Sequence, residues 1–172
     1  MPPAPIANPF PRVRIPYGTW GSSYFPAWQA SAFAEVNPGP LAAEAMALIL
    51  GRRKTPLQCI DYLVTGSTIP WRWKFWNSPF LAASAGRRIP GCHVEQACAT
   101  GLQAILHAAM EVQAGGCEVS AVLTFDRTSD SSVGVFPERR SPVRTPALND
   151  VWDNFGFDPS VGASMLAAVR WR

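Results

Sequence analysis

The chain has 172 residues, of which 48% are hydrophobic and 16% are charged, which is typical of a globular domain and argues against disorder. Its 15 basic and 12 acidic residues leave a net charge of +3, and the basic residues are scattered pairs, which argues against a nucleic-acid-binding protein. No run of 18 apolar residues predicts a membrane span, and the first residues lack the basic and apolar regions of a signal peptide. Four cysteines and two histidines without zinc-site spacing predict no metal and a reducing, cytoplasmic setting.

The N-terminal part of the chain runs from a proline-rich segment into a helical pattern. Residues 1–11 are rich in proline, and we expect an extended arm there. Pro38-Gly39-Pro40 opens a pattern of apolar residues at helical spacing, and Gly51 is expected to stop it. Residues 60–64 are typical of a short buried strand, after which Gly66 is expected to turn the chain.

Aromatic and basic residues alternate from Trp71 onwards and end at Trp76. This alternation permits two interpretations. The segment is either a strand that stacks on a flat surface, or an aromatic loop or strand that packs at a subunit interface.

Two short elements are predicted next. Ser78-Pro79 is a favourable N-cap and first-turn pair for a short helix, and Gly86 is a favourable end for it. Residues 92–97 indicate a strand. We expect His93 in this strand to pack or to hydrogen-bond there, and not to act in catalysis.

Residues 99–114 form the clearest predicted helix, which Gly115-Gly116 ends. Its core face is predicted to carry Leu102, Ile105, Ala109 and Val112. Residues 119–125 follow as a buried strand, residues 126–159 as a long polar excursion, and a last helix reaches Arg172. Since strands and helices alternate at short intervals, the fold class is α/β with a mostly parallel sheet.

Cys98 lies where the predicted strand meets the clearest helix. A thiol at a helix start faces unpaired backbone N–H groups and the positive end of the helix dipole, which favour the nucleophilic thiolate. The same N–H groups can stabilise an oxyanion on an attached acyl group. The alternative from spacing alone is that Cys98 is a buried, inert cysteine.

The segment around Cys98 resembles the nucleophile motif of the thiolase superfamily. Pro90-Gly91, a short strand and then Cys98-Ala99-Thr100-Gly101-Leu102-Gln103-Ala104 match that motif, with threonine in place of a serine. Weaker similarity lies at Arg14-Ile15-Pro16-Tyr17-Gly18, at Ile60-Asp61 and at Asn77. Together these matches extend over roughly residues 12–168, and they are typical of a divergent acetyl-CoA acyltransferase or 3-ketoacyl-CoA thiolase-like protein.

The resemblance implies the N-terminal half of the layered thiolase fold, a mostly parallel sheet with helices on both faces. Residues 12–126 would form the core of that half, after the arm of residues 1–11. Residues 127–172 would hold the start of a loop excursion and a terminal helix.

The resemblance also implies a function. Cys98 would form an acyl-cysteine from an acyl-CoA, for Claisen condensation or for thiolytic cleavage of a 3-oxoacyl-CoA. Coenzyme A thioesters would be substrates, with no tightly bound cofactor. Three arginines of the excursion would contact coenzyme A phosphates or form a basic patch on the surface or between subunits: Arg139, Arg140 and Arg144.

Departures from the family pattern favour a divergent branch with an unusual substrate. Val122-Leu123-Thr124-Phe125-Asp126 stands where the family has a small Ala-Gly-Gly, and the arginine expected soon after Asn77 is missing. The two histidine motifs and second cysteine of the family's second half are not found in the sequence. Counted along an extended strand, His93 lies roughly 16 Å from Cys98 and out of reach of it.

We therefore expect a protein chain that supplies the C-terminal thiolase half, an oligomeric assembly, and no turnover by this chain alone. Two alternatives are a non-catalytic scaffold subunit of an acyl-CoA-processing complex and a retro-aldolase like the lipid-transfer relatives of thiolases. The presence of a nucleophilic cysteine argues against the retro-aldolase, which needs no acyl-enzyme.

Overall fold

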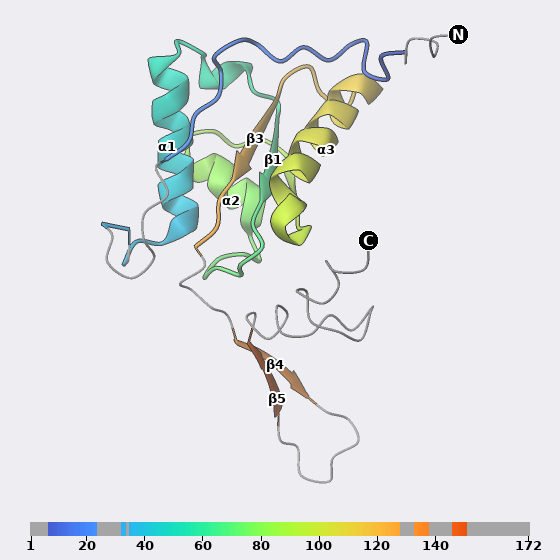
Figure 1. The fold of residues 1–172 in the computed structure, drawn as a ribbon. Helices are drawn as coiled ribbons and strands as arrows, with labels where there is room; N and C mark the ends of the chain where they lie inside the picture. The colour runs from blue at the N-terminus through green and yellow to red at the C-terminus, as the bar shows by residue number, and fades with distance from the viewer. Residues whose placement is uncertain (1–6, 24–31, 34, 128–132, 138–145, 151–172) are drawn as a thin grey trace, which may run out of the picture. The chain divides into compact units, whose positions relative to one another are not determined.

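The computed structural model describes residues 7–23, 32–33, 35–127, 133–137 and 146–150. The chain divides into two units, Met1–Asp126 and Arg127–Arg172, and each is described by itself. The first unit contains a parallel sheet with helices on both of its faces (Figure 1). In the second unit, β4 (Val133–Pro137) pairs antiparallel with β5 (Pro146–Asp150).

The sheet of the first unit has three parallel strands in the order β2-β1-β3. The central strand is β1 (Tyr62–Gly66), and its neighbours are β2 (Gly91–Val94) and β3 (Ser120–Thr124). The strands end in register, since Gly66 lies opposite both Val94 and Thr124. The predicted α/β class with a mostly parallel sheet is confirmed.

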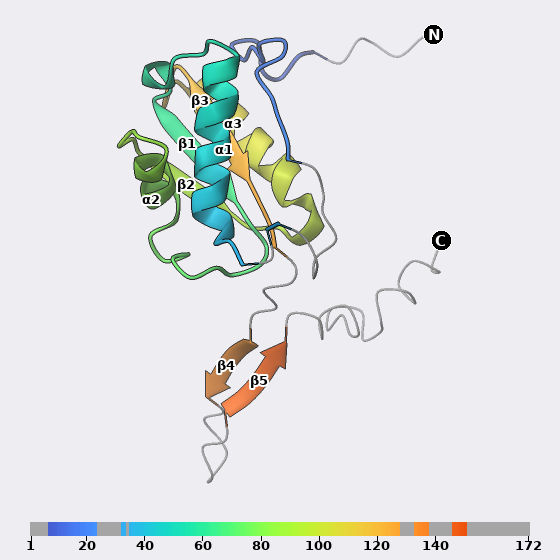
Figure 2. The same ribbon diagram turned by 90° about the vertical axis from the view of Figure 1, so that its left-hand side faces the viewer.

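Three helices cover the two faces of this sheet. On the face to which Leu63 points, α1 (Pro38–Arg52) and α2 (Asn77–Ser84) form one apolar cluster around that side chain. On the face to which Val64 points, α3 (Thr100–Ala114) packs alone. Successive strand residues point to opposite faces, which is why Leu63 and Val64 belong to different clusters. Figure 2 shows α1 in front of the sheet and α3 behind it.

The predicted helix at Pro38-Gly39-Pro40 is confirmed as α1, although its end is not where glycine suggested. The Asn37 side chain accepts a hydrogen bond from the Gly39 N–H (3.3 Å), which caps the start. Gly51 lies within the helix, and the chain leaves it only after Arg52, where Lys54 takes a positive φ of 53°. A glycine in an open, exposed position tolerates helical dihedrals, so it does not by itself end a helix.

The first strand begins and ends two residues later than the sequence indicated. A 3₁₀ turn, Leu57–Cys59, comes directly before the expected strand, and Gly66 is the last residue of β1 instead of a turn residue. Glycine is needed at Gly66 because a Cβ there would lie 2.6 Å from Thr100 Cγ2. The glycine marks close contact between β1 and α3.

The aromatic segment from Trp71 to Trp76 forms successive turns, so the strand interpretation is wrong. Trp71 is buried and contacts the rings of Phe80 and Phe125, with centroids 6.0 and 5.7 Å away. Phe75 and Trp76 are exposed. An interface role for these exposed rings stays a prediction.

Ser78 is not the cap of α2 but a buried residue in its first turn. The helix starts at Asn77, and the Ser78 hydroxyl donates to the Cys92 carbonyl of β2 and lies 2.5 Å from Thr65 Oγ1. The Ser78 hydroxyl bonds with polar groups of the sheet and therefore does not cap the N–H groups of its own helix. Gly86 lies beyond the end of α2 with a φ of 97°, so its predicted role is confirmed.

The clearest predicted helix is confirmed as α3, with Gly115 in the left-handed region after it, but its predicted core face is wrong. The buried stripe is Thr100, Ala104 and Ala108, whereas Leu102 and Ile105 are exposed. Small residues at this spacing let α3 approach β1 closely, and the large apolar side chains are left outward.

The strand predicted at residues 119–125 is confirmed as β3, but its residues are half-buried or exposed, so the expectation of a buried strand is wrong. Its start is held by Asp61, whose carboxylate accepts from the N–H groups of Glu118 (2.8 Å) and Val119 (2.9 Å). These two hydrogen bonds lower the pKa of Asp61.

The polar excursion predicted for residues 126–159 contains the antiparallel β4–β5 pair. The predicted last helix lies outside the described residues, as do Arg139, Arg140 and Arg144. In the part of the chain that the structure describes, none of the helices is long and apolar enough to span a membrane.

Candidate active site

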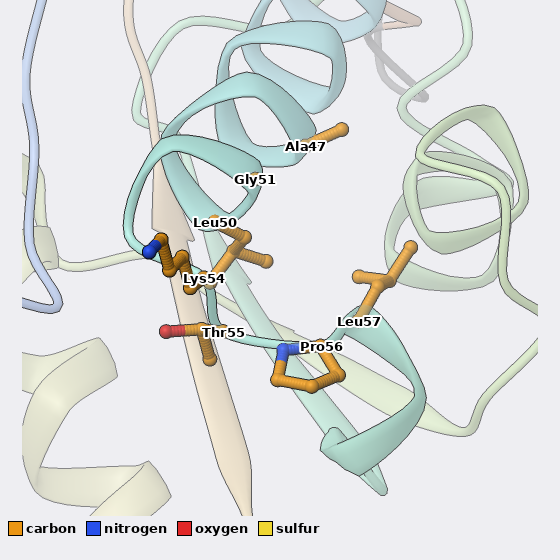
Figure 3. Close-up of a pocket in the computed structure, with 7 residues that line it drawn as sticks. All are labelled: Ala47, Leu50, Gly51, Lys54, Thr55, Pro56 and Leu57. Carbon is orange, nitrogen blue, oxygen red and sulfur yellow. The ribbon is translucent and has the colours of Figure 1, made fainter.

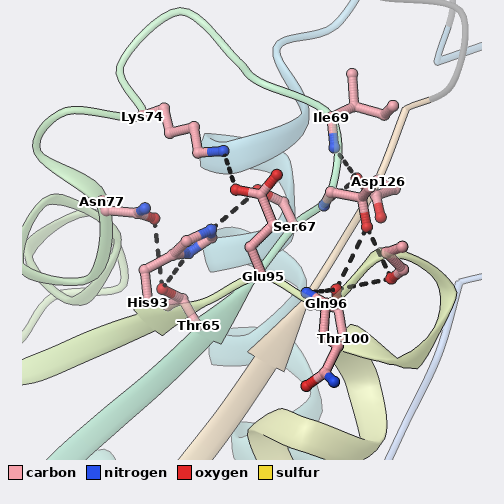
Figure 4. Close-up of polar contacts among 12 residues, drawn as sticks. Thr65, Ser67, Ile69, Lys74, Asn77, His93, Glu95, Gln96, Thr100 and Asp126 are labelled. Atoms are coloured by element: carbon pink, nitrogen blue, oxygen red, sulfur yellow. Dashed lines mark hydrogen bonds and ion pairs between the residues drawn. The ribbon is translucent and has the colours of Figure 1, made fainter. Parts of the chain in front are cut away.

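The candidate site lies at the carboxyl edge of the parallel sheet, where the three strands end side by side. Open parallel sheets bind their ligands at this edge. The loops that follow β1, β2 and β3 meet there, and Figure 4 shows the polar contacts among them.

Cys98 is exposed in a 3₁₀ turn, Ala97–Ala99, directly before α3. The helix-start position predicted for Cys98 is confirmed, and the alternative that it is buried is wrong. The strand before it ends at Val94, because the chain turns at Ala97 with a positive φ of 44°. Distances counted along an extended strand from His93 to Cys98 therefore do not apply.

The turn before Cys98 is held by two threonine hydroxyls. Thr100 Oγ1 donates to the Ala97 carbonyl (2.7 Å), and Thr68 Oγ1 donates to the same oxygen (2.9 Å). Thr100 Oγ1 also accepts from the Gln96 N–H (2.8 Å). Asp126 fixes the loop that carries Thr68, since its Oδ1 accepts from the N–H groups of Thr68 and Ile69 at 2.8 Å each.

His93 lies among hydroxyl groups at the same edge. Its Nδ1 is 3.0 Å from Thr65 Oγ1 and its Nε2 is 3.5 Å from Ser67 Oγ, so the prediction that His93 hydrogen-bonds within its strand region is confirmed. Burial, with a smaller contribution from the positive charge of Lys74, lowers the pKa of His93. The neutral ring is favoured near neutral pH.

The four cysteines differ in how they are placed. Burial raises the pKa of the Cys92 thiol, which also hydrogen-bonds with the Tyr62 side chain, and burial raises the pKa of Cys117. Cys59 is exposed, like Cys98, but it precedes β1 and lies at the opposite edge of the sheet. Cys59 is therefore an internal reference for an exposed thiol outside the site.

A surface hollow lies at the C-terminal end of α1, and Figure 3 shows the residues that line it. They include Leu50, Lys54 and Leu57, and none of the lining residues belongs to the loops around Cys98. Nothing connects this hollow with the candidate site. Within the described residues, no three His, Cys, Asp or Glu side chains are gathered as a metal ion would require.

Thr68 and Asp126 were not predicted from the sequence as site residues, and Thr100 was predicted only through its place in the motif. Asp126 was noted only as part of a departure from the family pattern. A threonine directly after a strand is a weak signal, and its partner lies far along the chain. Coenzyme A contacts of Arg139, Arg140 and Arg144 stay a prediction, since these residues lie outside the described part.

No model of a known protein family matches the sequence, and no curated protein is significantly similar to it. Solved structures are similar. An acetyl-CoA acetyltransferase from Bacillus anthracis matches with 26% identity and a TM-score of 0.64. One from Syntrophomonas wolfei matches with 20% identity and a TM-score of 0.60, and human mitochondrial 3-ketoacyl-CoA thiolase with 17% and 0.63.

Each match covers 78% of this chain and 35% of the solved chain, so the chain corresponds to only part of these enzymes. The parallel sheet, the helices on both faces and the thiol at the start of α3 are the features that the sequence motif led us to expect. The chain therefore has the fold of the thiolase superfamily and corresponds to the N-terminal half of that fold.

Proposed function

We propose that this chain is the nucleophile-bearing part of a thiolase-like acyltransferase, in which Cys98 accepts the acyl group of an acyl-CoA. The observation that supports this proposal most is the exposed thiol in the turn before α3, at the carboxyl edge of a sheet with the thiolase fold. The matched structures that are named acetyl-CoA acetyltransferases agree with this chemistry.

In the proposed reaction, the Cys98 sulfur attacks the thioester carbonyl and forms a tetrahedral oxyanion. The Cys98 backbone N–H donates to that oxyanion. The intermediate then collapses, the bond to the coenzyme A sulfur breaks, and coenzyme A leaves with the proton that the thiol gave up. The product is an acyl-cysteine that serves condensation with a second acyl-CoA, or that arises during thiolysis of a 3-oxoacyl-CoA.

A complete cycle needs a base and a site for the enolate oxygen, which we expect from a C-terminal half on another chain or segment. The share of the matched enzymes that this chain spans, 35%, supports this part of the proposal. Exposed apolar side chains on α3 support it as well, because a large apolar patch marks an interaction surface. The residues are Leu102, Ile105, Leu106 and Met110. We expect the assembly in the reducing cytoplasm, in agreement with four unpaired cysteines.

The test is incubation with acetyl-CoA or a longer acyl-CoA, followed by peptide mass spectrometry. We expect acylation at Cys98 and not at Cys59, with none at either in Cys98→Ser. We expect no measurable cleavage of acetoacetyl-CoA by this chain alone, because a proton-transfer group is worth roughly 10²–10⁴-fold in rate. Acylation of Cys59 in preference to Cys98, or robust turnover by the chain alone, would overturn the assignment.

A non-catalytic scaffold subunit is the second candidate, and the exposed apolar face of α3 favours it equally. The rates at which acetyl-CoA acylates the two exposed thiols separate the two candidates. A scaffold predicts equal rates for Cys98 and Cys59, whereas a catalytic Cys98 is acylated faster than Cys59.

A further inference from the structure

The carbonyl of Ala97 receives an unusual number of donors for an exposed turn. It accepts from the hydroxyls of Thr100 and Thr68 and from the backbone N–H of Thr100. Figure 4 shows Thr100 among the polar contacts at this edge of the sheet. All three donors act on the peptide that joins Ala97 to Cys98.

Fixing this carbonyl also fixes the direction of the Cys98 N–H. In a trans peptide the C=O and N–H groups lie in one plane and point in opposite directions. With the Ala97 oxygen held toward Thr68 and Thr100, the Cys98 N–H points away from them. The peptide has to be held, because Ala97 has a positive φ of 44°, which side chains other than glycine rarely adopt.

Thr100 itself has little freedom to move. It is 4% exposed, its hydroxyl accepts from the Gln96 N–H, and its methyl group packs against Gly66 so closely that a Cβ on that glycine would lie 2.6 Å away. Thr68 is held from its other side, since Asp126 accepts from its N–H. The hydroxyls are placed before any substrate arrives.

We infer that Thr100, assisted by Thr68, is a positioning residue that holds the Ala97–Cys98 peptide so that the Cys98 N–H donates to the oxyanion of an incoming acyl group. This inference rests on the proposed role of Cys98 as the acyl acceptor. Thr100 acts only through the peptide and touches no substrate. Loss of its hydroxyl frees the peptide to rotate and weakens the oxyanion donor while the thiol stays exposed.

The experiment uses two reagents on the full chain and reads both at Cys98 by mass spectrometry, with Cys59 as internal reference. With p-nitrophenyl acetate, a bond forms between Sγ and the acetyl carbon, the ester C–O bond breaks, p-nitrophenolate leaves, and the thiol proton goes to solvent. This acetylation passes through an oxyanion and needs no recognition of coenzyme A. Alkylation by iodoacetamide displaces iodide and forms no oxyanion.

The variants are Thr100→Val, which keeps the shape and the contact with Gly66 but loses the hydroxyl, and Thr100→Ser, which keeps the hydroxyl. We expect Thr100→Val to slow acetylation of Cys98 about 10-fold, part of the roughly 10²–10³-fold that one oxyanion donor supplies, and to leave alkylation unchanged. Thr100→Ser should retain the wild-type ratio of the two rates. Thr68→Val removes the other hydroxyl that donates to the Ala97 carbonyl and leaves α3 unchanged. It should also lower the ratio of the acetylation rate to the alkylation rate.

The inference would be overturned if Thr100→Val changed the acetylation and alkylation rates equally, or if neither Thr100→Val nor Thr68→Val changed them. It would also be overturned if the wild-type protein were acetylated no faster at Cys98 than at Cys59. Failure of the proposed function gives a different result. Acyl-CoA then does not react with Cys98, but the ratio of acetylation by p-nitrophenyl acetate to alkylation by iodoacetamide still depends on the Thr100 hydroxyl. That result supports the positioning role while it removes the coenzyme A chemistry.

Discussion

His93 lies among polar groups at the carboxyl edge of the sheet, and its protonation affects the stability of the fold. Its two ring nitrogens lie near the hydroxyls of Thr65 and Ser67, and its pKa is lowered mainly by burial and then by Lys74. Two nearby carboxylates, Glu95 and Asp126, act in the opposite direction. The net effect is a lowered pKa, which favours the neutral His93 ring in the folded state.

The consequence is a stability that falls in mild acid. Because the pKa of His93 is lower in the folded state than its ordinary value of 6.5, the unfolded chain binds the proton more readily. The contribution is present above about pH 6.5 and is lost as the pH falls through the lowered folded value. We expect the urea midpoint to fall between pH 7 and pH 5.5, and to fall less in His93→Asn.

An identical pH dependence in the wild type and in His93→Asn would show that His93 titrates alike in the folded and unfolded chains.

Two glycines near helix ends have opposite roles although both were interpreted as stop signals. Gly115 follows α3 with a φ of 82°, and its N–H donates to the Val112 carbonyl (3.2 Å). Gly51 lies inside α1, and a Cβ there would have nothing within 4 Å. The backbone conformation at each glycine, and not the residue type, decides whether the helix ends there.

We expect Gly115→Ala to lower the free energy of unfolding by about 1–2 kcal/mol, the cost of a left-handed conformation for a residue with a Cβ. Gly51→Ala should raise it by roughly 0.5–1 kcal/mol, because alanine favours a helix interior. Urea unfolding of both variants beside the wild type is the measurement. Stabilisation by Gly115→Ala would contradict the left-handed end of α3.

Across the first unit, the outer face of α3 carries a row of exposed apolar side chains that begins beside the site. Leu102 is 76% exposed and Met110 is 52% exposed, on a helix whose opposite face touches the sheet through small residues. A helix that is apolar on both sides is typical of one buried between two layers. This is the surface on which we expect the proposed C-terminal thiolase half, or a second copy, to pack.

Sedimentation velocity across a range of concentrations tests this expectation. The wild-type chain should self-associate, and Leu106→Glu with Met110→Glu should shift it toward monomer without loss of folding, since both side chains are exposed. Leu48→Glu places the same charge on an exposed leucine of α1 and should leave association unchanged. A wild-type chain that stays monomeric at every concentration would contradict the prediction.

The features that depend on local chemistry could be predicted from the sequence. Apolar spacing and glycine placed α1, α3 and β3 within a few residues, and the motif around Cys98 located the thiol at a helix start. These predictions succeeded because helix periodicity and left-handed glycine ends are properties of short segments. The α/β class followed from the order of the elements alone.

Two features depend on contacts between distant segments and could not be predicted from the sequence: which face of α3 is buried, and which groups hold the turn before Cys98. Large and small apolar residues repeat on α3 at the same spacing, and the small stripe packs because Gly66 brings β1 close. Hydrogen bonds at the Ala97 carbonyl join Thr100 to Thr68 and, through Thr68, to Asp126. These residues come from the start of α3, the loop after β1 and the loop after β3, and they meet only because the strands are parallel. Such contacts depend on strand order and register, for which no local pattern carries a signal.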